Sequence, residues 1–186
     1  MTAPLASDAE NLDRLLGRFL RRFAFIGPTN IETVAERFAA FIKAAEVPRD
    51  PFEILPLLGI TIERAILPRG TRAVWKREDG RYVFRVSQHR IHASVRFGLW
   101  ECMFEVMVSH PRFPSALAPG VKDRLAGRFA SLLLMPKTTV LAAAKKFQTN
   151  PGALVPILAG KFGVGMTAMR LRLRELRVEG TQQAAR

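Results

Sequence analysis

Residues 99–110, LWECMFEVMVSH, form a nearly continuous apolar stretch that is interrupted by two glutamates, Glu101 and Glu105. The apolar residues between 97 and 108 would cover almost the whole circumference of a helix, which is typical of a helix buried in a protein core. Residues four apart lie on the same face of a helix, so both carboxylates would point into whatever packs beside it. We therefore expect a partner for them, because a buried pair of like charges carries a large desolvation cost.

Three kinds of partner would satisfy these two carboxylates. An arginine is the commonest source of such clusters, and the candidates near in sequence or on the following predicted helix are Arg85, Arg90, Arg124 and Arg128. A hard divalent cation such as magnesium, manganese or calcium would suit carboxylate oxygens. A proton shared between the two carboxylates is the third alternative.

Outside this stretch, the spacing of apolar and turn residues predicts an α+β chain. Period-two alternation with turn residues between the runs predicts a small antiparallel sheet of three strands, at 60–64, 73–76 and 82–86. Helical spacing and capping patterns predict helices over 8–25, 29–45, 51–59, 89–108, 121–135, 136–147, 152–162 and 166–176. The last two helices flank a short Gly-containing turn and resemble a helix-turn-helix unit.

The composition indicates a folded and strongly basic protein. Apolar residues make up 48% of the 186 residues, and the formal net charge of +13 would attract polyanions such as nucleic acid or an acidic protein. The single cysteine, Cys102, excludes an internal disulfide. No apolar run approaches the roughly 18 residues that a membrane span requires. No secretory signal pattern is visible either, so we expect a cytoplasmic protein without a membrane partner.

The positive charge is densest in one C-terminal segment, at Arg170, Arg172, Arg174 and Arg177. One interpretation is a nucleic-acid-binding surface. The other is a solvated basic face, which is favoured by the absence of aromatic stacking residues in this segment.

Several segments together resemble the ImmA/IrrE-type metallopeptidase family, over about residues 31–178. The stretch 96–105, RFGLWECMFE, resembles the helix in which an Arg-Phe pair leads into the zinc-binding HExxH motif. Residues 123–136, DRLAGRFASLLLMP, resemble the helix that carries an acidic third ligand, and 158–176, LAGKFGVGMTAMRLRLREL, resembles the helix-turn-helix-like segment that follows. The resemblance implies that the predicted sheet packs on a zincin-like helical core.

At the site itself the chain departs from the motif of the family. In the ungapped register, Glu101 and Glu105 stand at the two zinc-binding histidines. Cys102 then stands at the general-base glutamate, and Asp123 at the acidic third ligand. A register shifted by one residue keeps Glu101 as the base but puts aromatic residues at both ligand positions. Neither register retains the zinc-peptidase set, so the resemblance implies loss of zinc-dependent hydrolysis.

Other residues near the helix are expected to have structural roles. Cys102 is not an obvious replacement for the base, because a lone thiol in an apolar helix is usually a small core residue. We expect His110 to be a loop or capping residue, and His89 and His92 to lie at the surface.

Three hypotheses about function follow. The first is a degenerate metallopeptidase-like protein without zinc peptidase activity, which acts as a regulatory or protein-interaction module linked to transcriptional repressors or stress response. By resemblance, its partner would be a repressor-type DNA-binding protein. The second is an enzyme in which Glu101, Glu105 and Asp123 bind a divalent cation other than zinc as cofactor. The third is a protein that contacts DNA directly through its basic C-terminal helices.

The expected organisation has four parts. These are an N-terminal helical extension, a metallopeptidase-like domain, a helix-turn-helix-like segment packed on it and a polar tail, at 1–28, 29–136, 137–180 and 181–186.

Overall fold

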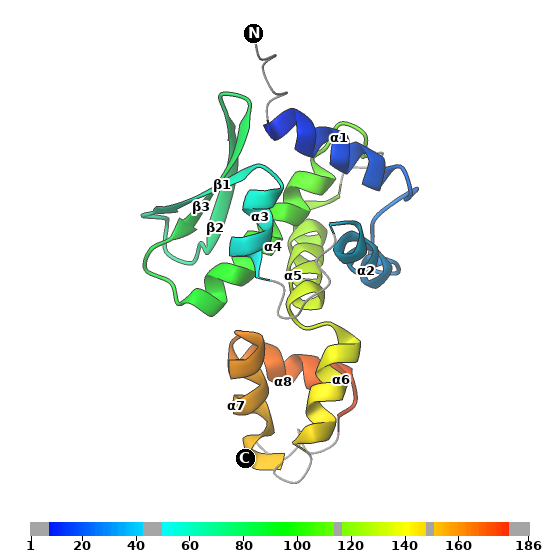
Figure 1. Cartoon of the computed structure of the whole chain (residues 1–186), viewed down its shortest axis with the longest axis vertical. Coiled ribbons are helices and arrows are strands. Elements are labelled where there is room, and N and C mark those ends of the chain that lie inside the picture. The colour runs from blue at the N-terminus through cyan, green and yellow to red at the C-terminus, as the bar shows by residue number, and fades with distance from the viewer. Residues whose placement is uncertain (1–7, 43–49, 114–116, 148–150, 179–186) are drawn as a thin grey trace.

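The computed structural model describes residues 8–42, 50–113, 117–147 and 151–178. Helix α4 (His92–Val108) lies at the centre of the larger part of the molecule and buries residues all around its circumference, as its sequence predicts. Helix α5 (Pro119–Leu134) packs against it, and the rings of Phe104 and Phe129 lie 5.5 Å apart between the two helices. This helix pair carries Glu101 and Glu105 on α4 and Asp123 on α5, and Figure 1 shows how the two helices are arranged.

A three-stranded sheet packs against α4, so that the predicted α+β class is confirmed. Its strands are β1 (Ile60–Ala65), β2 (Ala73–Glu78) and β3 (Arg81–Ser87), in the order β1-β3-β2. Strand β3 pairs antiparallel with β2 but parallel with β1. The predicted purely antiparallel sheet was therefore wrong, because the sheet is mixed.

The central position of β3 explains the mixed pairing. It is the most buried of the three strands, and a strand buried on both faces belongs in the middle of a sheet. A tight turn at Asp79 and Gly80, with φ of 48° and 74°, makes β2 and β3 an antiparallel hairpin. The segment 66–72 then has to cross about 10 Å, two strand spacings, to leave room for β3.

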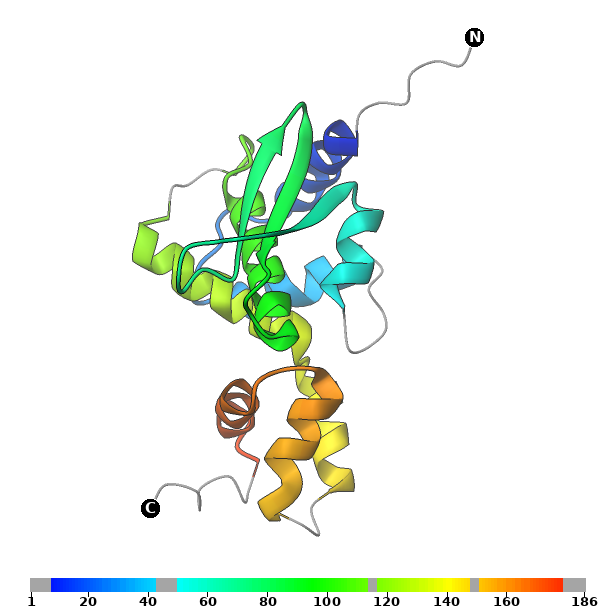
Figure 2. The same cartoon turned by 90° about the vertical axis from the view of Figure 1, so that its left-hand side faces the viewer.

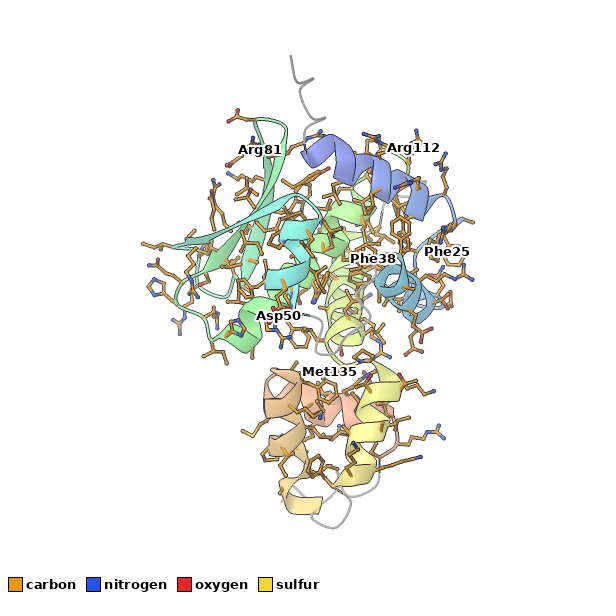
Figure 3. The ribbon with its side chains drawn as sticks, in the orientation of Figure 1. Phe25, Phe38, Asp50, Arg81, Arg112 and Met135 are labelled. Atoms are coloured by element: carbon orange, nitrogen blue, oxygen red, sulfur yellow. The ribbon has the colours of Figure 1, made fainter. Side chains whose placement is uncertain are left out.

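Three further helices complete this part of the molecule, α1 (Asp8–Leu20), α2 (Ile31–Phe41) and α3 (Pro51–Leu57). The ring of Phe38 in α2 lies 5.3 Å from that of Phe19 in α1 and 5.5 Å from that of Phe129 in α5. Figure 3 shows Phe38 between these helices. Helices α1 and α2 therefore share one hydrophobic core with α4 and α5.

Helices α6 (Lys137–Lys146), α7 (Pro151–Phe162) and α8 (Met166–Glu175) form a cluster that we call the C-terminal lobe. Figures 1 and 2 show it below the sheet and the other helices from two directions. Helices α7 and α8 are bent by 110° relative to one another, which is the geometry of a helix-turn-helix pair. No single described helix is long and apolar enough to cross a membrane, although α7 and α8 reach that length and apolar content when taken together across their bend.

Two buried arginines, each 2% exposed, join the C-terminal lobe to α4 and α5. Arg96 of α4 donates from Nη1 to the carbonyl oxygens of Phe162 and Gly163, both at 2.8 Å, where α7 ends. Arg172 of α8 donates from Nε to the carbonyl oxygen of Met135 at 3.0 Å, where α5 gives way to α6. Figure 3 labels Met135 at this junction. The two parts are thus connected by reciprocal contacts from buried side chains.

Candidate functional site

The position of Glu101 and Glu105 depends on a close approach between α4 and the start of β2. A Cβ atom at Gly98 of α4 would lie 2.7 Å from the Cβ of Arg72 and 3.1 Å from the backbone nitrogen of Ala73. Only glycine permits this approach, because both neighbours belong to or adjoin the backbone of β2. The contact brings side chains from the start of β2 within reach of both glutamates.

The two glutamates have different partners. Arg72 donates from Nη1 to Oε1 of Glu101 at 2.6 Å, in an ion pair whose side chains are 45% and 24% exposed, respectively. Trp75 donates from Nε1 to Oε2 of Glu105 at 3.1 Å. The carboxylates are therefore partly exposed and each has its own partner, whereas the sequence predicted a buried pair that needs a partner.

The structure contains the arginine partner that was one of the three alternatives. The arginine is Arg72, however, and none of the four candidates that proximity in the sequence suggested. Arg85 instead pairs with Glu63 and Glu78 on the sheet, and Arg128 joins α2 to α8 by ion pairs with a glutamate of each. Arg72 precedes Glu101 by 29 residues, and only the placement of β2 beside α4 brings them together.

Asp123 does not join the two glutamates, and the predicted carboxylate site is not formed. Its side chain is exposed near the beginning of α5. Within the described ranges, no group of three His, Cys, Asp or Glu side chains is placed so that it could hold a metal ion. Glu101 and Glu105 instead accept hydrogen bonds from an arginine and an indole.

Cys102, between the two glutamates, is buried in the core. Burial raises the pKa of its thiol well above the ordinary range, and the charges of Glu105 and Glu101 raise it further. A thiol that remains protonated serves neither as a general base nor as a nucleophile. Cys102 is thus a core residue, as its sequence context predicts.

The three histidines have the structural positions that we expected. His110 lies just after α4, where its Nδ1 accepts from the backbone N–H of Arg112 at 3.1 Å. Its Nε2 therefore carries the proton, which it donates to the carbonyl oxygen of Asp13 at 3.0 Å. His89 and His92 are exposed, and the ring of His92 stacks on Phe52.

The four C-terminal arginines do not form one surface. Arg172 is buried and donates to the carbonyl oxygen of Met135, so its inclusion in a nucleic-acid-binding surface was wrong. Arg174 and Arg177 are exposed, and Arg170 is partly exposed. The alternation of leucine and arginine in this segment does not reveal which arginine faces inward.

A pocket of about 800 Å³ lies between α1, the β2–β3 hairpin and the residues after α4. It was not predicted from the sequence. We call it the basic pocket, because its lining includes five arginines, Arg14, Arg18, Arg21, Arg77 and Arg112. Figure 3 labels Arg112 beside α1. Arg14 and Arg18 of α1 and Arg21 just after its end recur at helical spacing, which is a signal for a shared face. Only the fold adds the other two.

The comparisons with known proteins support a fold and no family. No protein-family model and no curated protein sequence matches the chain. A solved structure described as a Mycobacterium tuberculosis transcriptional regulator is similar to 88% of this chain, with a TM-score of 0.55 and 20% sequence identity. The similar region is 51% of that protein, so the chain spans about half of its length. At this level of identity, the similarity shows a shared fold.

Proposed function

We propose that this chain is a regulatory, protein-binding module in transcription control, built on a metallopeptidase-like fold that lacks zinc-dependent hydrolysis. The proposal rests chiefly on the contacts of Glu101 and Glu105, at the positions where the resemblance puts zinc-binding histidines. Arg72 donates a hydrogen bond to the carboxylate of Glu101, and Trp75 donates one to the carboxylate of Glu105. The fold shared with a transcriptional regulator supports the link to transcription.

The neighbouring residues also argue against hydrolysis. A zinc peptidase needs three ligands, an open position for water and a general base. Cys102 occupies the position of the base, and its buried thiol has a raised pKa. Asp123 occupies the position of the third ligand, but its side chain is exposed on α5 and belongs to no metal-holding group of described residues.

The C-terminal lobe supports protein binding. Ile157, Met166 and Leu171 are large apolar side chains that remain exposed on α7 and α8. Exposed arginines such as Arg174 lie on the same helix as Leu171. Apolar anchors with positive charge nearby suit a protein partner that carries acidic groups, whereas contact with a phosphate backbone has little use for exposed leucine and methionine.

The partner can be tested by comparing two exposed leucines. Leu171 on α8 is 52% exposed and Leu57 on α3 is 86% exposed. We expect Leu171→Glu to abolish the crosslinking of the tagged protein to a repressor-type DNA-binding protein identified by mass spectrometry, because a charge opposes burial in an apolar contact. Leu57→Glu, the matched control, should leave the crosslink intact.

Two results would count against this proposal. Equal crosslinking of both variants would exclude the C-terminal lobe as the docking surface. Direct binding to duplex DNA that weakens in Arg174→Gln and Arg177→Gln, with a steep dependence on salt, would instead favour the DNA-binding hypothesis. The exposure of Arg174 and Arg177 is the observation that supports DNA binding as the second candidate function.

A further inference from the structure

We infer that the basic pocket binds a phosphorylated small molecule, a ligand class that the proposed regulatory function does not require. The pocket lies between α1, the β2–β3 hairpin and the segment that follows α4. Its volume of about 800 Å³ falls within the range of about 300–1,000 Å³ that is usual for small-molecule sites.

The charge of the pocket selects an anion. Its five arginines are opposed by a single acidic side chain, Asp13, so the lining carries four net positive charges. Asp13 is itself engaged on both oxygens, because Tyr82 Oη donates to Oδ1 at 2.6 Å and Arg77 Nη2 lies 3.0 Å from Oδ2. Among the described residues, no carboxylate pairs with the guanidinium groups of Arg18, Arg21 or Arg112. Like charges that converge on a recess without their own counter-ions attract an anion strongly.

The wall of the pocket is held in place by buried groups. Tyr82 and His110 are 6% and 8% exposed, and both bind Asp13, the first at its carboxylate and the second at its backbone carbonyl. Desolvation and the hydrogen bond to Asp13 raise the pKa of the Tyr82 hydroxyl, so it remains a donor. His110 also fixes the backbone of Arg112. The site is therefore organised by hydrogen bonds that do not depend on a ligand.

Gly17 of α1 makes room for one of the arginines. A Cβ atom there would lie 3.2 Å from Cδ of Arg112 and 3.5 Å from Cε1 of His110. The side chain of Arg112 therefore packs against α1 where the helix lacks a side chain, in the pocket that Arg14 and Arg18 also line. The glycine is a poor helix former in the middle of α1, and this contact gives its position a physical reason.

The shape and the aromatic residues favour a small phosphorylated compound over duplex DNA. Guanidinium groups bind phosphate through paired N–H donors. Trp75 and Tyr82 also line the pocket, with their ring centroids 6.0 Å apart, and they provide apolar surface for the organic part of a ligand. A duplex needs an interface of roughly 1,000–2,500 Å², whereas these arginines surround a single recess.

Titration calorimetry at physiological ionic strength tests this inference with pyrophosphate and ADP as probes. We expect saturable binding that is weakened about tenfold or more in both Arg18→Gln and Arg112→Gln, because each removes a charge-assisted hydrogen bond. Arg90→Gln removes the same charge from an exposed position at the other end of α4 and should leave affinity within about twofold. Thermal unfolding of each variant should match the unaltered protein, since all three side chains are exposed.

The outcomes separate the sources of the phosphate. Tighter binding of ADP than of pyrophosphate would indicate that the ligand is an organic phosphate. Binding of ADP should then change the tryptophan fluorescence, and Trp75→Phe should remove that change. Equal affinities for ADP and pyrophosphate would indicate that the pocket recognises the phosphate groups alone. The inference fails if neither probe binds, if Arg90→Gln weakens binding as much as Arg18→Gln, or if only duplex DNA binds and competes through these arginines. None of these results depends on whether a protein partner binds the C-terminal lobe.

Discussion

At the scale of single residues, Glu101 and Glu105 share one face of α4 but have separate partners. Both remain on one face of α4, where the resemblance puts two histidine ligands, but each accepts a hydrogen bond from a different side chain. Glu101 is held by a guanidinium that is close to half exposed, and Glu105 by an indole. Neither carboxylate requires a metal ion to offset the loss of its hydration.

A double-mutant cycle on Arg72 and Glu101 measures this pairing. We expect Arg72→Ala, Glu101→Ala and the double variant to give a coupling free energy of about 0.2–1 kcal/mol by urea denaturation, because a partly exposed ion pair is weakened by solvent screening. The coupling should shrink as salt is added. A coupling of zero at low salt would contradict the contact, and a large cation-dependent coupling would indicate that Glu101 binds a metal.

Some of these residue-scale features could be predicted from the sequence and others could not. The shared face of Glu101 and Glu105 and the buried position of Cys102 follow from helical spacing. The identity of Arg72 as partner does not, because it depends on a contact between elements 29 residues apart. The indole donor Trp75 has no sequence signal at all, since an aromatic residue in a strand is usually only a core residue.

At the scale of secondary structure, periodicity predicts which elements exist more reliably than how they pair. The three strands occur where alternation predicts them, but the parallel pairing of β1 with β3 reflects the path of the connection 66–72, which alternation does not encode. Helix α2 begins at Ile31, two residues later than the predicted start at 29, after Asn30, whose side-chain oxygen accepts a hydrogen bond from the backbone N–H of Gly27. Local hydrogen bonds of this kind decide where a helix begins.

The turn between α7 and α8 offers a prediction that belongs to this scale. Gly163 has φ of 59°, and a Cβ atom there would collide with Nη1 of Arg96, which is buried and carries the contact between the two parts of the molecule. We expect Gly163→Ala to reduce the free energy of unfolding by about 2–4 kcal/mol, from backbone strain and the displaced guanidinium.

Gly160→Ala is the matched control for that change, and chemical denaturation measures both. Gly160 lies in α7, is exposed and has open space around its Cβ position. Alanine there should stabilise the helix, by at most about 1 kcal/mol. If Gly163→Ala and Gly160→Ala changed the free energy of unfolding equally, the contact of Arg96 with the end of α7 would not contribute to stability.

At the scale of the whole molecule, two features have separate places. The C-terminal lobe, attached through Arg96 and Arg172, presents exposed apolar side chains and some of the exposed arginines. The basic pocket lies at the C-terminal end of α4, among α1 and the β2–β3 hairpin, and gathers a further part of the net charge of +13. The net charge predicts an anionic partner, but only the fold shows that the exposed side chains of the C-terminal lobe and the arginines of the basic pocket lie apart.

Our central proposal is that Glu101 and Glu105 do not form part of a zinc-peptidase site. The most direct measurement is the zinc content of the purified protein, by mass spectrometry of the metal after dialysis against zinc-containing buffer and then against metal-free buffer. We expect substoichiometric zinc that is unchanged in Glu101→Ala and Glu105→Ala. One tightly bound zinc per chain that is lost in both variants, together with cleavage of a repressor, would contradict it.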